Sequence, residues 1–252
     1  MTTRDWDAAT YDRVADPQAE WAQVVLERLE LKGDETVLDA GCGSGRVTAM
    51  LLERLPEGRV IAVDSAPSMV ERARASLPAD RVQVLPPADL TRLELDKAVD
   101  AVFSNAVFHW VPDHDALFSR LHAALRPGGR LIAQCGGAGN VAAFHEAANA
   151  VASEPPFAEY LDGWIGPWRF EAPEPTEERL RAAGFEGARC WLSDAPVVPP
   201  EPLAFIRTVC LRAHLEQLPN ELWDRYVAAV AERCGEPLEL DYVRLNIDAR
   251  RA

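Results

Sequence analysis

Two patterns of hydrophobic positions alternate along the first half of the chain. Short apolar runs rich in β-branched residues predict buried strands, and the stretches between them place apolar side chains at the spacing of one helix face. Strands that alternate with helices predict an α/β sheet that is mostly parallel, with helices on both faces, because crossovers between parallel strands are right-handed. The predicted strands are 36–40, 59–64, 82–85, 99–108 and 129–135, and the predicted helices are 17–31, 46–55, 67–77 and 114–125.

The second half of the chain is less regular and holds most of the prolines. Large aromatic residues fall between the prolines of 155–175, whereas solvated linkers contain few of them, so this segment predicts a folded cover. We expect one domain over 1–252, with an N-terminal cap helix in 1–30 and a substrate cover formed by about 140–175 plus 195–235. The other predicted elements are a helix at 140–153, a helix, turn and strand over 176–192, helices at 201–217 and 219–234, and a last strand at 238–251.

The charge balance narrows the choice of partners. The chain has 26 Lys and Arg against 40 Asp and Glu, which gives a formal net charge of −14. A nucleic-acid site needs clustered basic residues to neutralise phosphates. We therefore expect no nucleic acid among the partners of this protein.

The cysteine pattern and the lengths of the apolar runs disfavour disulfide-rich, metal-binding, secreted and membrane-spanning proteins. The five cysteines are widely spaced and form no C-x-x-C pair, which disfavours a disulfide framework and a metal site and indicates buried thiols in a reducing compartment. The polar, acidic N-terminus has no signal-peptide core, and no apolar run reaches the ~18 residues of a membrane span. The sequence predicts a cytoplasmic protein, a monomer or homodimer, with no metal and no membrane partner.

The sharpest local feature is a glycine loop between the first predicted strand and the following helix, with the sequence DAGCGSG at 39–45. Glycine permits a tight turn and lets a ligand come close to the backbone. A dinucleotide loop of the form G-x-G-x-x-G would need glycine at position 46, where this chain has Arg46, and Asp39 would repel a pyrophosphate. The loop therefore disfavours a nicotinamide or flavin oxidoreductase and favours a ligand with a positive charge.

Five segments, in order, resemble the motifs of class I S-adenosylmethionine (SAM) dependent methyltransferases. They read VLDAGCGSG at 37–45, AVDSAPSMVERAR at 62–74, PPADL at 86–90, FSNAVFHWVPD at 103–113 and LRPGGRLIAQ at 125–134. The resemblance implies a Rossmann-like seven-stranded sheet whose last strand is antiparallel. It also implies SAM as methyl donor, S-adenosylhomocysteine (SAH) as product and a small molecule as methyl acceptor. WDAATYDRVADPQAEW at 6–21 and NAVFHWVPDH at 105–114 look most like the trans-aconitate methyltransferases and related small-molecule methyltransferases.

The resemblance further implies where SAM would bind. Asp39 and the glycine-loop amides would hold its amino-acid portion, and Asp64 would accept bonds from both ribose hydroxyls. Asp89 would meet the adenine amine, with the amides of Ala88 and Leu90 on the ring nitrogens. Each aspartate could instead cap the helix or turn after it, and a methionine in such a helix could be core. The predicted cofactor residues are Asp39, Ala40, Gly41, Gly43, Arg46, Asp64, Ser65, Met69, Ala88, Asp89, Leu90, Asn105 and Ala106.

A small carboxylic acid would suit a sparse acceptor site. A carboxylate is already a nucleophile at neutral pH, so its oxygen needs only to be aimed at the methyl group and no general base is required. Tyr11, Gln18 and the Trp110 indole could donate to that oxygen. His109 could add a proton, or act as a base if the acceptor is a phenol or an acidic carbon. These four form the predicted catalytic set, although His109 and Trp110 would equally suit core positions.

Other interpretations stay open at this point. Arg169 and Arg207 could pair with a second carboxylate of the substrate, or could lie solvated on the surface. One alternative function is a C- or O-methyltransferase of secondary metabolism that acts on a phenol or an acidic carbon. Another is a SAM-binding protein without catalysis.

Overall fold

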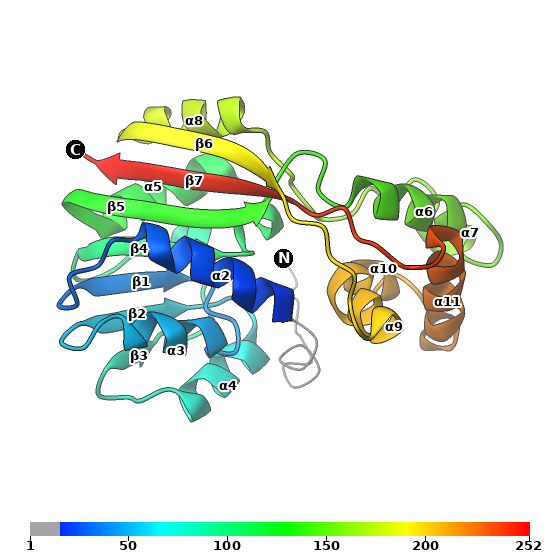
Figure 1. Cartoon of the computed structure of the whole chain (residues 1–252), viewed down its shortest axis with the longest axis horizontal. Helices are drawn as coiled ribbons and strands as arrows, with labels where there is room; N and C mark the ends of the chain where they lie inside the picture. The colour runs from blue at the N-terminus through cyan, green and yellow to red at the C-terminus, as the bar shows by residue number, and fades with distance from the viewer. Residues whose placement is uncertain (1–15) are drawn as a thin grey trace.

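Seven strands form one sheet in the computed structural model, which describes the backbone of residues 16–252 and the side chains of residues 21–252. They are β1 Thr36–Ala40, β2 Arg59–Val63, β3 Val82–Val84, β4 Val99–Asn105, β5 Leu125–Gly136, β6 Phe185–Asp194 and β7 Val243–Arg251. The order across the sheet is β3-β2-β1-β4-β5-β7-β6, and β7 alone runs opposite to the other six strands (Figure 1). The expected sheet, mostly parallel with an antiparallel last strand, is confirmed.

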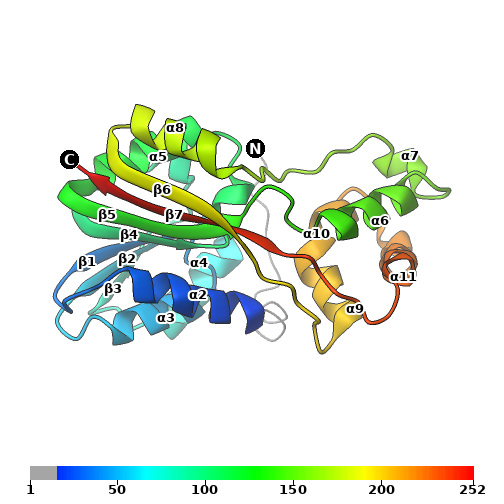
Figure 2. The same cartoon turned by 45° about the horizontal axis from the view of Figure 1, so that its top comes forward.

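The helices fall into two groups, one on the sheet and one beyond it. Against one face of the sheet lie α2 Asp16–Arg28, α3 Arg46–Glu53 and α4 Pro67–Ser76, and against the other lie α5 His114–Ala124 and α8 Pro173–Ala182. The second group is α6 Ala142–Ala152, α7 Ala158–Leu161, α9 Pro202–Phe205, α10 Arg212–Leu215 and α11 Trp223–Cys234. Figure 2 shows this second group as a separate lobe beyond one end of the strands.

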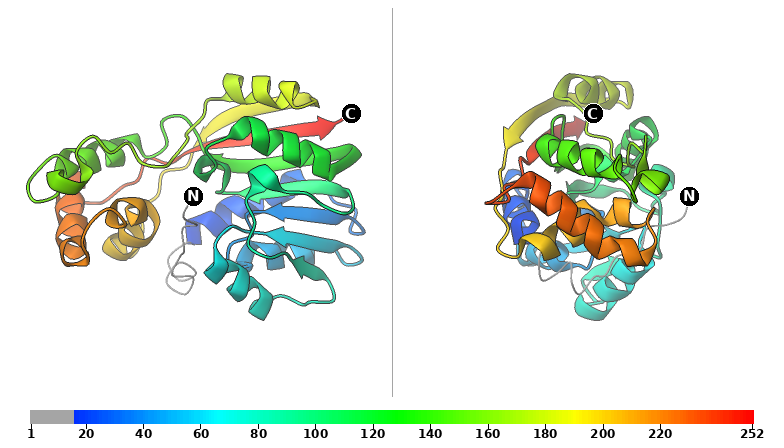
Figure 3. Two further views of the ribbon diagram at one scale, coloured as in Figure 1. Left: turned by 180° about the vertical axis from the view of Figure 1, so that it is seen from behind. Right: turned by 90° about the vertical axis from the view of Figure 1, so that its right-hand side faces the viewer.

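The second group, which we call the helical lobe, has an apolar core of its own. Phe157, Phe205 and Tyr226 are buried in that core, and the Tyr226 hydroxyl donates to the Ala148 carbonyl at 3.0 Å. The chain enters the lobe from the carboxyl end of β5, and Figure 3 shows the lobe from behind and from the side. Carboxyl ends of parallel strands are where ligands of open α/β sheets bind. The lobe therefore stands where a cover would stand, and its closure over a substrate stays a prediction.

The strand predicted over 99–108 ends earlier, because the backbone turns sharply after β4. Ala106 has φ +61°, a left-handed conformation that a strand does not accommodate, and a 3₁₀ turn follows at Phe108–Trp110. The last strand also differs: it begins at Val243 rather than at 238. The residues before it send Leu238 and Leu240 into the core of the helical lobe instead.

The helix predicted over 201–217 is interrupted in the structure. A π-helical turn at Ile206–Cys210 separates α9 from α10, and the Leu211 amide donates to the Ile206 carbonyl at 2.7 Å across five residues. Such turns are inserted where a helix must shift its face. The shift lets Cys210 and Leu211 both reach the lobe's core.

Candidate active site

The glycine loop joins β1 to α3 at the carboxyl edge of the sheet. Gly41 and Cys42 donate their amides to the Val63 carbonyl at 2.8 and 2.9 Å, which fixes the loop to the end of β2. Gly41 has φ +96°, and a Cβ at this position would come within 2.1 Å of a Val107 methyl group, so only glycine fits. The loop is thus held rigidly between β2 and the segment after β4.

Open space lies over the middle of this loop. Gly43 has φ +53°, and no heavy atom of the described residues lies within 4 Å of the place a Cβ would take. Its amide donates to Oδ2 of Asp64 at 2.9 Å, and the Ala66 amide donates to Oδ1 of Asp64 at 2.9 Å. Asp64 thus ties the loop to the start of α4 beside the open space. A carboxylate has about four acceptor positions, and the two amides use one on each oxygen, so Asp64 can still accept bonds from other donors. Bonds from the ribose hydroxyls of SAM to Asp64 stay a prediction.

Asp39, on β1, is almost fully buried, with 1% of its surface exposed. Its Oδ2 accepts a hydrogen bond from the Thr48 hydroxyl at 2.7 Å. Burial raises the pKa of Asp39 to about 7 against the opposing effect of that bond, and the nearby charge of Asp64 raises it further. Burial raises the pKa of Asp64 as well. Two carboxyl groups that are costly to ionise together favour a cationic ligand and disfavour a phosphate.

The third predicted cofactor segment makes its bonds within the protein. The Ala88 amide donates to the Asp64 carbonyl at 2.9 Å, so it is not available to a ring nitrogen of adenine, and the prediction for Ala88 is wrong. The predicted bond from the Leu90 amide to the adenine ring stays a prediction. Asp89 is exposed, and its Oδ1 accepts from the amide and the hydroxyl of Thr91 at 2.9 and 2.8 Å. Asp89 therefore caps the short turn after it, which is the alternative that the sequence left open. A bond to the adenine amine stays a prediction.

The remaining predicted cofactor residues differ in exposure. Ala40 and Met69 are buried, with 0% and 4% of their surface exposed, so Met69 takes the core role that the sequence left open. Ser65 and Arg46 are exposed, and Arg46 is the first residue of α3. Contacts between these residues and SAM stay predictions.

A strained turn follows β4 next to the glycine loop. Asn105 ends the strand, and the amide of Ala106 donates to the Gln134 carbonyl on β5 at 2.7 Å. A non-glycine residue with positive φ costs energy and persists where surrounding contacts hold it, which is common at functional sites. The turn brings Asn105 and Ala106 to the same edge as Gly41, and it directs the chain toward His109.

His109 is buried and neutral. Its Nδ1 accepts a hydrogen bond from the Gly136 amide at 3.2 Å, so the ring proton of the neutral form sits on Nε2. Burial holds the pKa of His109 well below its usual range, and the charges of Arg244 and His114 lower it further. With Nδ1 engaged and Nε2 protonated, this ring is arranged to donate a hydrogen bond rather than to accept a proton.

Aromatic rings extend from His109 toward the helical lobe. The ring of Phe170 stacks on His109 with centroids 5.7 Å apart, and the ring of Trp168 lies 5.9 Å from Trp110. Trp168 and Phe170 belong to the segment predicted as a cover. His145 of α6 lies 4.7 Å from Trp168, and nothing in the sequence marked it as part of a site.

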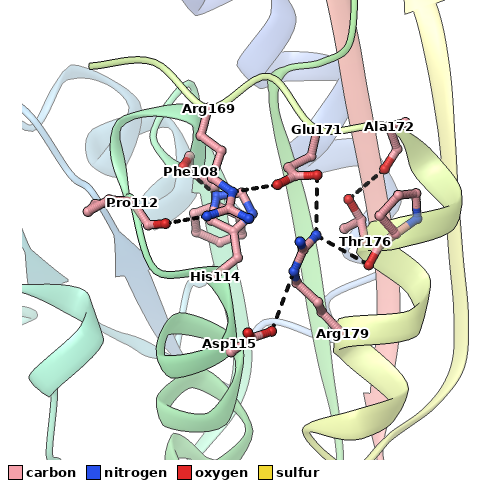
Figure 4. Close-up of polar contacts among 10 residues, drawn as sticks. Phe108, Pro112, His114, Asp115, Arg169, Glu171, Ala172, Thr176 and Arg179 are labelled. Atoms are coloured by element: carbon pink, nitrogen blue, oxygen red, sulfur yellow. Dashed lines mark hydrogen bonds and ion pairs between the residues drawn. The ribbon is translucent and has the colours of Figure 1, made fainter. Parts of the chain in front are cut away.

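A polar network holds Arg169 and Glu171, the residues on either side of Phe170, and Figure 4 shows this network. Arg169 donates to the Pro112 carbonyl at 2.6 Å and pairs with Glu171, and its amide donates to the His109 carbonyl at 2.8 Å. Glu171 also pairs with Arg179 of α8 at 3.2 Å. Arg169 is therefore engaged in holding the segment around Phe170 onto the sheet.

Tyr11, Gln18 and Arg207 are not brought to the site by the described residues. Tyr11 lies outside the described residues, and so does the side chain of Gln18, whose backbone is part of α2. Arg207 pairs with Asp224 on the surface of the helical lobe, which is the alternative to a substrate contact.

Two negative findings apply to the described part of the chain. None of its helices is long and apolar enough to cross a membrane. No group of three or more His, Cys, Asp or Glu side chains in residues 21–252 is arranged to hold a metal ion.

Comparison with known proteins gives one family model and many relatives. The model described as a methyltransferase domain matches residues 38–133. The trans-aconitate 2-methyltransferase of Variovorax paradoxus (strain S110) is 31% identical over 250 residues, which cover 96% of this chain and 94% of that protein. The enzyme of the same name from Azoarcus sp. (strain BH72) is 34% identical over 234 residues, covering 93% and 77% of the two chains.

Solved structures show the same fold at lower identity. The YcgJ protein of Bacillus subtilis has a TM-score of 0.65 at 12% identity, covering 92% of this chain and 98% of that one. Phosphoethanolamine N-methyltransferase 2 of Haemonchus contortus, solved with phosphomonomethylethanolamine and SAH, has a TM-score of 0.60 at 21% identity, covering 92% and 52%. The [4+2]-cyclase SpnF has a TM-score of 0.59 at 22% identity, covering 92% and 80%. Because these proteins differ in their names and activities, the fold by itself does not identify an acceptor.

Proposed function

Because this chain belongs to the SAM-dependent methyltransferases that include the trans-aconitate 2-methyltransferases, we propose that it methylates a carboxylate oxygen of a small organic acid. The chain is a SAM-dependent methyltransferase. What we add is the acceptor atom, the residues that hold each reactant and the absence of a general base.

The residues at the glycine loop fit SAM. The open space over Gly43 leaves room for a ligand against the backbone, and Asp39 and Asp64 offer negative charge next to it. SAM carries a sulfonium and an ammonium group and no phosphate, so its charge complements this pair. We assign its amino-acid portion to Asp39 and the loop, and its ribose to Asp64.

When bound, SAM supplies an electrophilic methyl group whose bond to sulfur breaks as an acceptor oxygen bonds the carbon, which leaves SAH. A carboxylate acceptor brings its own electron pair and loses no proton. The protein's residues then need only to orient that oxygen and exclude water, which is catalysis by positioning.

The state of His109 is the observation that supports a carboxylate most strongly. A phenol or an acidic carbon must lose a proton, which calls for a base close to the acceptor atom. His109 has Nδ1 engaged by the Gly136 amide and is held neutral, so it offers a donor at Nε2. A donor suits an acceptor that arrives already ionised. Trp110, next in the chain, offers an indole N–H of the same kind.

Methyl transfer from labelled SAM to a panel of small acids tests the proposal. We expect radioactive or carbon-13 methyl label in a product that alkaline hydrolysis releases as methanol, as an ester requires. Label that resists alkaline hydrolysis, on a phenol oxygen or on carbon, would overturn the carboxylate assignment. The cytoplasmic location and the monomer-or-homodimer state stay predictions, and light scattering of the purified protein tests the latter.

A further inference from the structure

A short 3₁₀ turn after β4 carries both His109 and Trp110. It is three residues long, and the Trp110 amide donates to the Val107 carbonyl at 2.8 Å. Such a turn has poorer hydrogen-bond geometry than an α-helix, and a single turn of chain has little stability of its own. The directions of the two rings therefore depend on the groups that hold this turn from outside.

Arg169 binds the turn region at two backbone carbonyls. Its amide donates to the His109 carbonyl at 2.8 Å, and its Nη1 donates to the Pro112 carbonyl, just after the turn, at 2.6 Å (Figure 4). Arg169 and Pro112 stand 57 positions apart in the chain, so this is a tertiary contact. Because both acceptors are backbone groups, the two bonds fix the path of the chain on either side of Trp110.

His114, the first residue of α5, makes a third bond of this kind. It has 2% of its surface exposed, and its Nε2 lies 2.9 Å from the Phe108 carbonyl. A carbonyl can only accept, so the ring donates from Nε2. The carbonyls of Phe108, His109 and Pro112 thus each accept a bond from a residue that lies outside the turn.

Residues 169–171 form a short strap along the end of β5, where the Ala138 amide donates to the Glu171 carbonyl at 2.9 Å. Phe170, at the centre of the strap, stacks on the His109 ring with the centroids 5.7 Å apart. Nδ1 of His109 already accepts a bond from β5 at 3.2 Å. Strap and strand together therefore set the direction of Nε2, the ring nitrogen that the proposed function uses as a donor.

Glu171 holds the Arg169 side chain in place. The two side chains pair, and Glu171 also pairs with Arg179 of α8 at 3.2 Å (Figure 4). Burial raises the pKa of Glu171, but the bond from Arg169 and the charge of Arg179 bring that pKa below its ordinary value, so the carboxylate is ionised at neutral pH. Arg179 pairs in turn with Asp115 of α5 at 3.4 Å. Partly buried pairs are screened less than open ones, so this network ties the strap firmly to the two helices.

On the basis of the proposed function, we propose that Arg169 is a positioning residue of methyl transfer. It acts on the protein's own turn rather than on a second carboxylate of the substrate. By holding the His109 and Pro112 carbonyls, it keeps the His109 and Trp110 rings directed at the acceptor carboxylate. Catalysis by positioning is sensitive to small displacements. Loss of Arg169 therefore slows the bound complex more than it weakens the binding of either reactant.

The substitution Arg169→Gln removes the guanidinium and leaves the backbone bond to His109. The probe is the acid, from a panel of mono-, di- and tricarboxylic acids, that the native protein methylates fastest at saturating SAM. We expect kcat, counted per molecule that binds SAH, to fall about tenfold or more, since a misplacement of about 1 Å can cost about a hundredfold. KM for the acid and the affinity for SAH should stay within about twofold of native. A kcat within about twofold of native, or an SAH affinity that falls as far as kcat, would overturn the inference.

Arg120 of α5 provides a matched control. It pairs with Glu94 at 2.9 Å, and its side chain is 42% exposed against 39% for Arg169. Arg120→Gln removes the same kind of ion pair away from the turn, so kcat should stay at the native value. An equal fall of kcat in the Arg120 and Arg169 variants would show that the loss of a surface pair, and not the aim of the rings, slows the reaction.

A double-mutant cycle with Trp110→Phe separates positioning from general support of the fold. If Arg169 acts through the turn, its loss matters little once the indole is gone, so Arg169→Gln should lower the kcat of Trp110→Phe by no more than about threefold. Two independent effects of about tenfold would multiply to about a hundredfold, which would overturn the inference and leave the proposed function standing. If the native protein yields no ester from any acid of the panel while it binds SAH, the proposed function itself fails, and this inference with it.

Discussion

The carboxyl edge of the sheet and the ring wall beside the helical lobe, which consists of Trp110, His145, Trp168 and Phe170, are held together by different kinds of contact. At the edge, Asp64 accepts short hydrogen bonds from the Gly43 and Ala66 amides, and Asp39 accepts one from the Thr48 hydroxyl. At the wall, the half-buried rings of Trp110, His145, Trp168 and Phe170 come from three segments of the chain and pack with centroids roughly 5–6 Å apart. Backbone hydrogen bonds fix the loop at the edge, whereas the rings of the wall are held mainly by packing against one another, with the Arg169–Glu171 pair beside them.

This difference separates the roles of the two regions. Backbone bonds such as those from Gly41 and Cys42 to Val63 hold the loop in one conformation. A fixed loop suits the methyl donor, which is the same molecule in every turnover. A wall of side chains changes with a few substitutions while the sheet beneath it stays the same. We therefore expect mutations at the edge to affect SAM binding and mutations at the wall to affect the acceptor.

Replacing Asp64 by alanine should have the largest effect on the edge. The variant loses the bonds to the Gly43 and Ala66 amides and the predicted bonds to the ribose, and two charge-assisted bonds correspond to about a hundredfold weaker SAM binding. Calorimetry with SAM and SAH measures this. Asp89→Ala serves as the control, and because Asp89 is an exposed cap it should cost no more than about tenfold. A change below about threefold in Asp64→Ala would mean that Asp64 is only a cap.

At the wall, we expect the substitution of Trp110 to lower kcat more than the substitution of His109. Trp110→Phe keeps an aromatic ring and removes the indole N–H, so we expect kcat to fall by more than about tenfold through loss of orientation. His109→Ala should stay within about tenfold, since a required general base would contribute about 10²–10⁴-fold. Steady-state rates with an accepted acid measure both. The reverse order, with His109→Ala losing a hundredfold or more, would indicate a phenol or carbon acceptor.

The raised pKa of Asp39 makes SAM binding depend on pH. Without SAM, Asp39 binds a proton up to about pH 7, whereas a cationic ligand favours the ionised carboxylate. The dissociation constant of SAM should therefore be about tenfold higher at pH 6 than at pH 8 and level off above pH 7. Asp39→Asn should flatten that profile. Equal affinity of the native protein at both pH values would contradict the assignment.

The same carboxyl group affects the stability of the SAM-free protein. The pKa of Asp39 is higher in the folded chain than the ordinary value of 3.8. Its favourable contribution to the free energy of unfolding is therefore present below about pH 4 and is lost as the pH rises through 7. Asp39→Asn should remove this loss in urea unfolding measured between pH 5 and 8.

The smallest expected effect concerns the segment 155–175. If it covers the acceptor, its amide hydrogens should exchange more slowly when SAH and an accepted acid are both bound. Residues 41–45 should be protected by SAH alone. Protection at 41–45 without any change in 155–175 would show that this segment is not a cover.

The two regions also differ in how far the sequence predicts them. The edge follows from local patterns: a buried strand that ends at Asp39, a glycine loop and a second strand that ends next to Asp64. Parallel pairing then brings the two aspartates to the same edge without further information. The sequence left the role of Asp89 undecided, because a cap and a ligand contact use the same residue type in the same turn.

The wall depends on contacts that no local pattern contains. His145 lies in an ordinary helix, so only the folded chain shows that its ring lies next to Trp168 and Phe170. The prediction of one continuous helix at 201–217 is wrong for a similar reason. The π turn at Ile206–Cys210 depends on how these residues pack in the core of the helical lobe, which the local sequence does not show. Residues 155–175 were marked by their aromatic content, which predicted a folded segment but not its partners.

The dependence of the methyl-transfer rate on pH tests the central claim most directly. Single-turnover rates with saturating SAM and an accepted acid, measured from pH 6 to 9, should stay level, because the acceptor is already ionised and His109 is not a base. The level profile should persist in His109→Ala. A rate that rises about tenfold per pH unit in the native protein, or a rate that falls a hundredfold or more in His109→Ala, would contradict the claim.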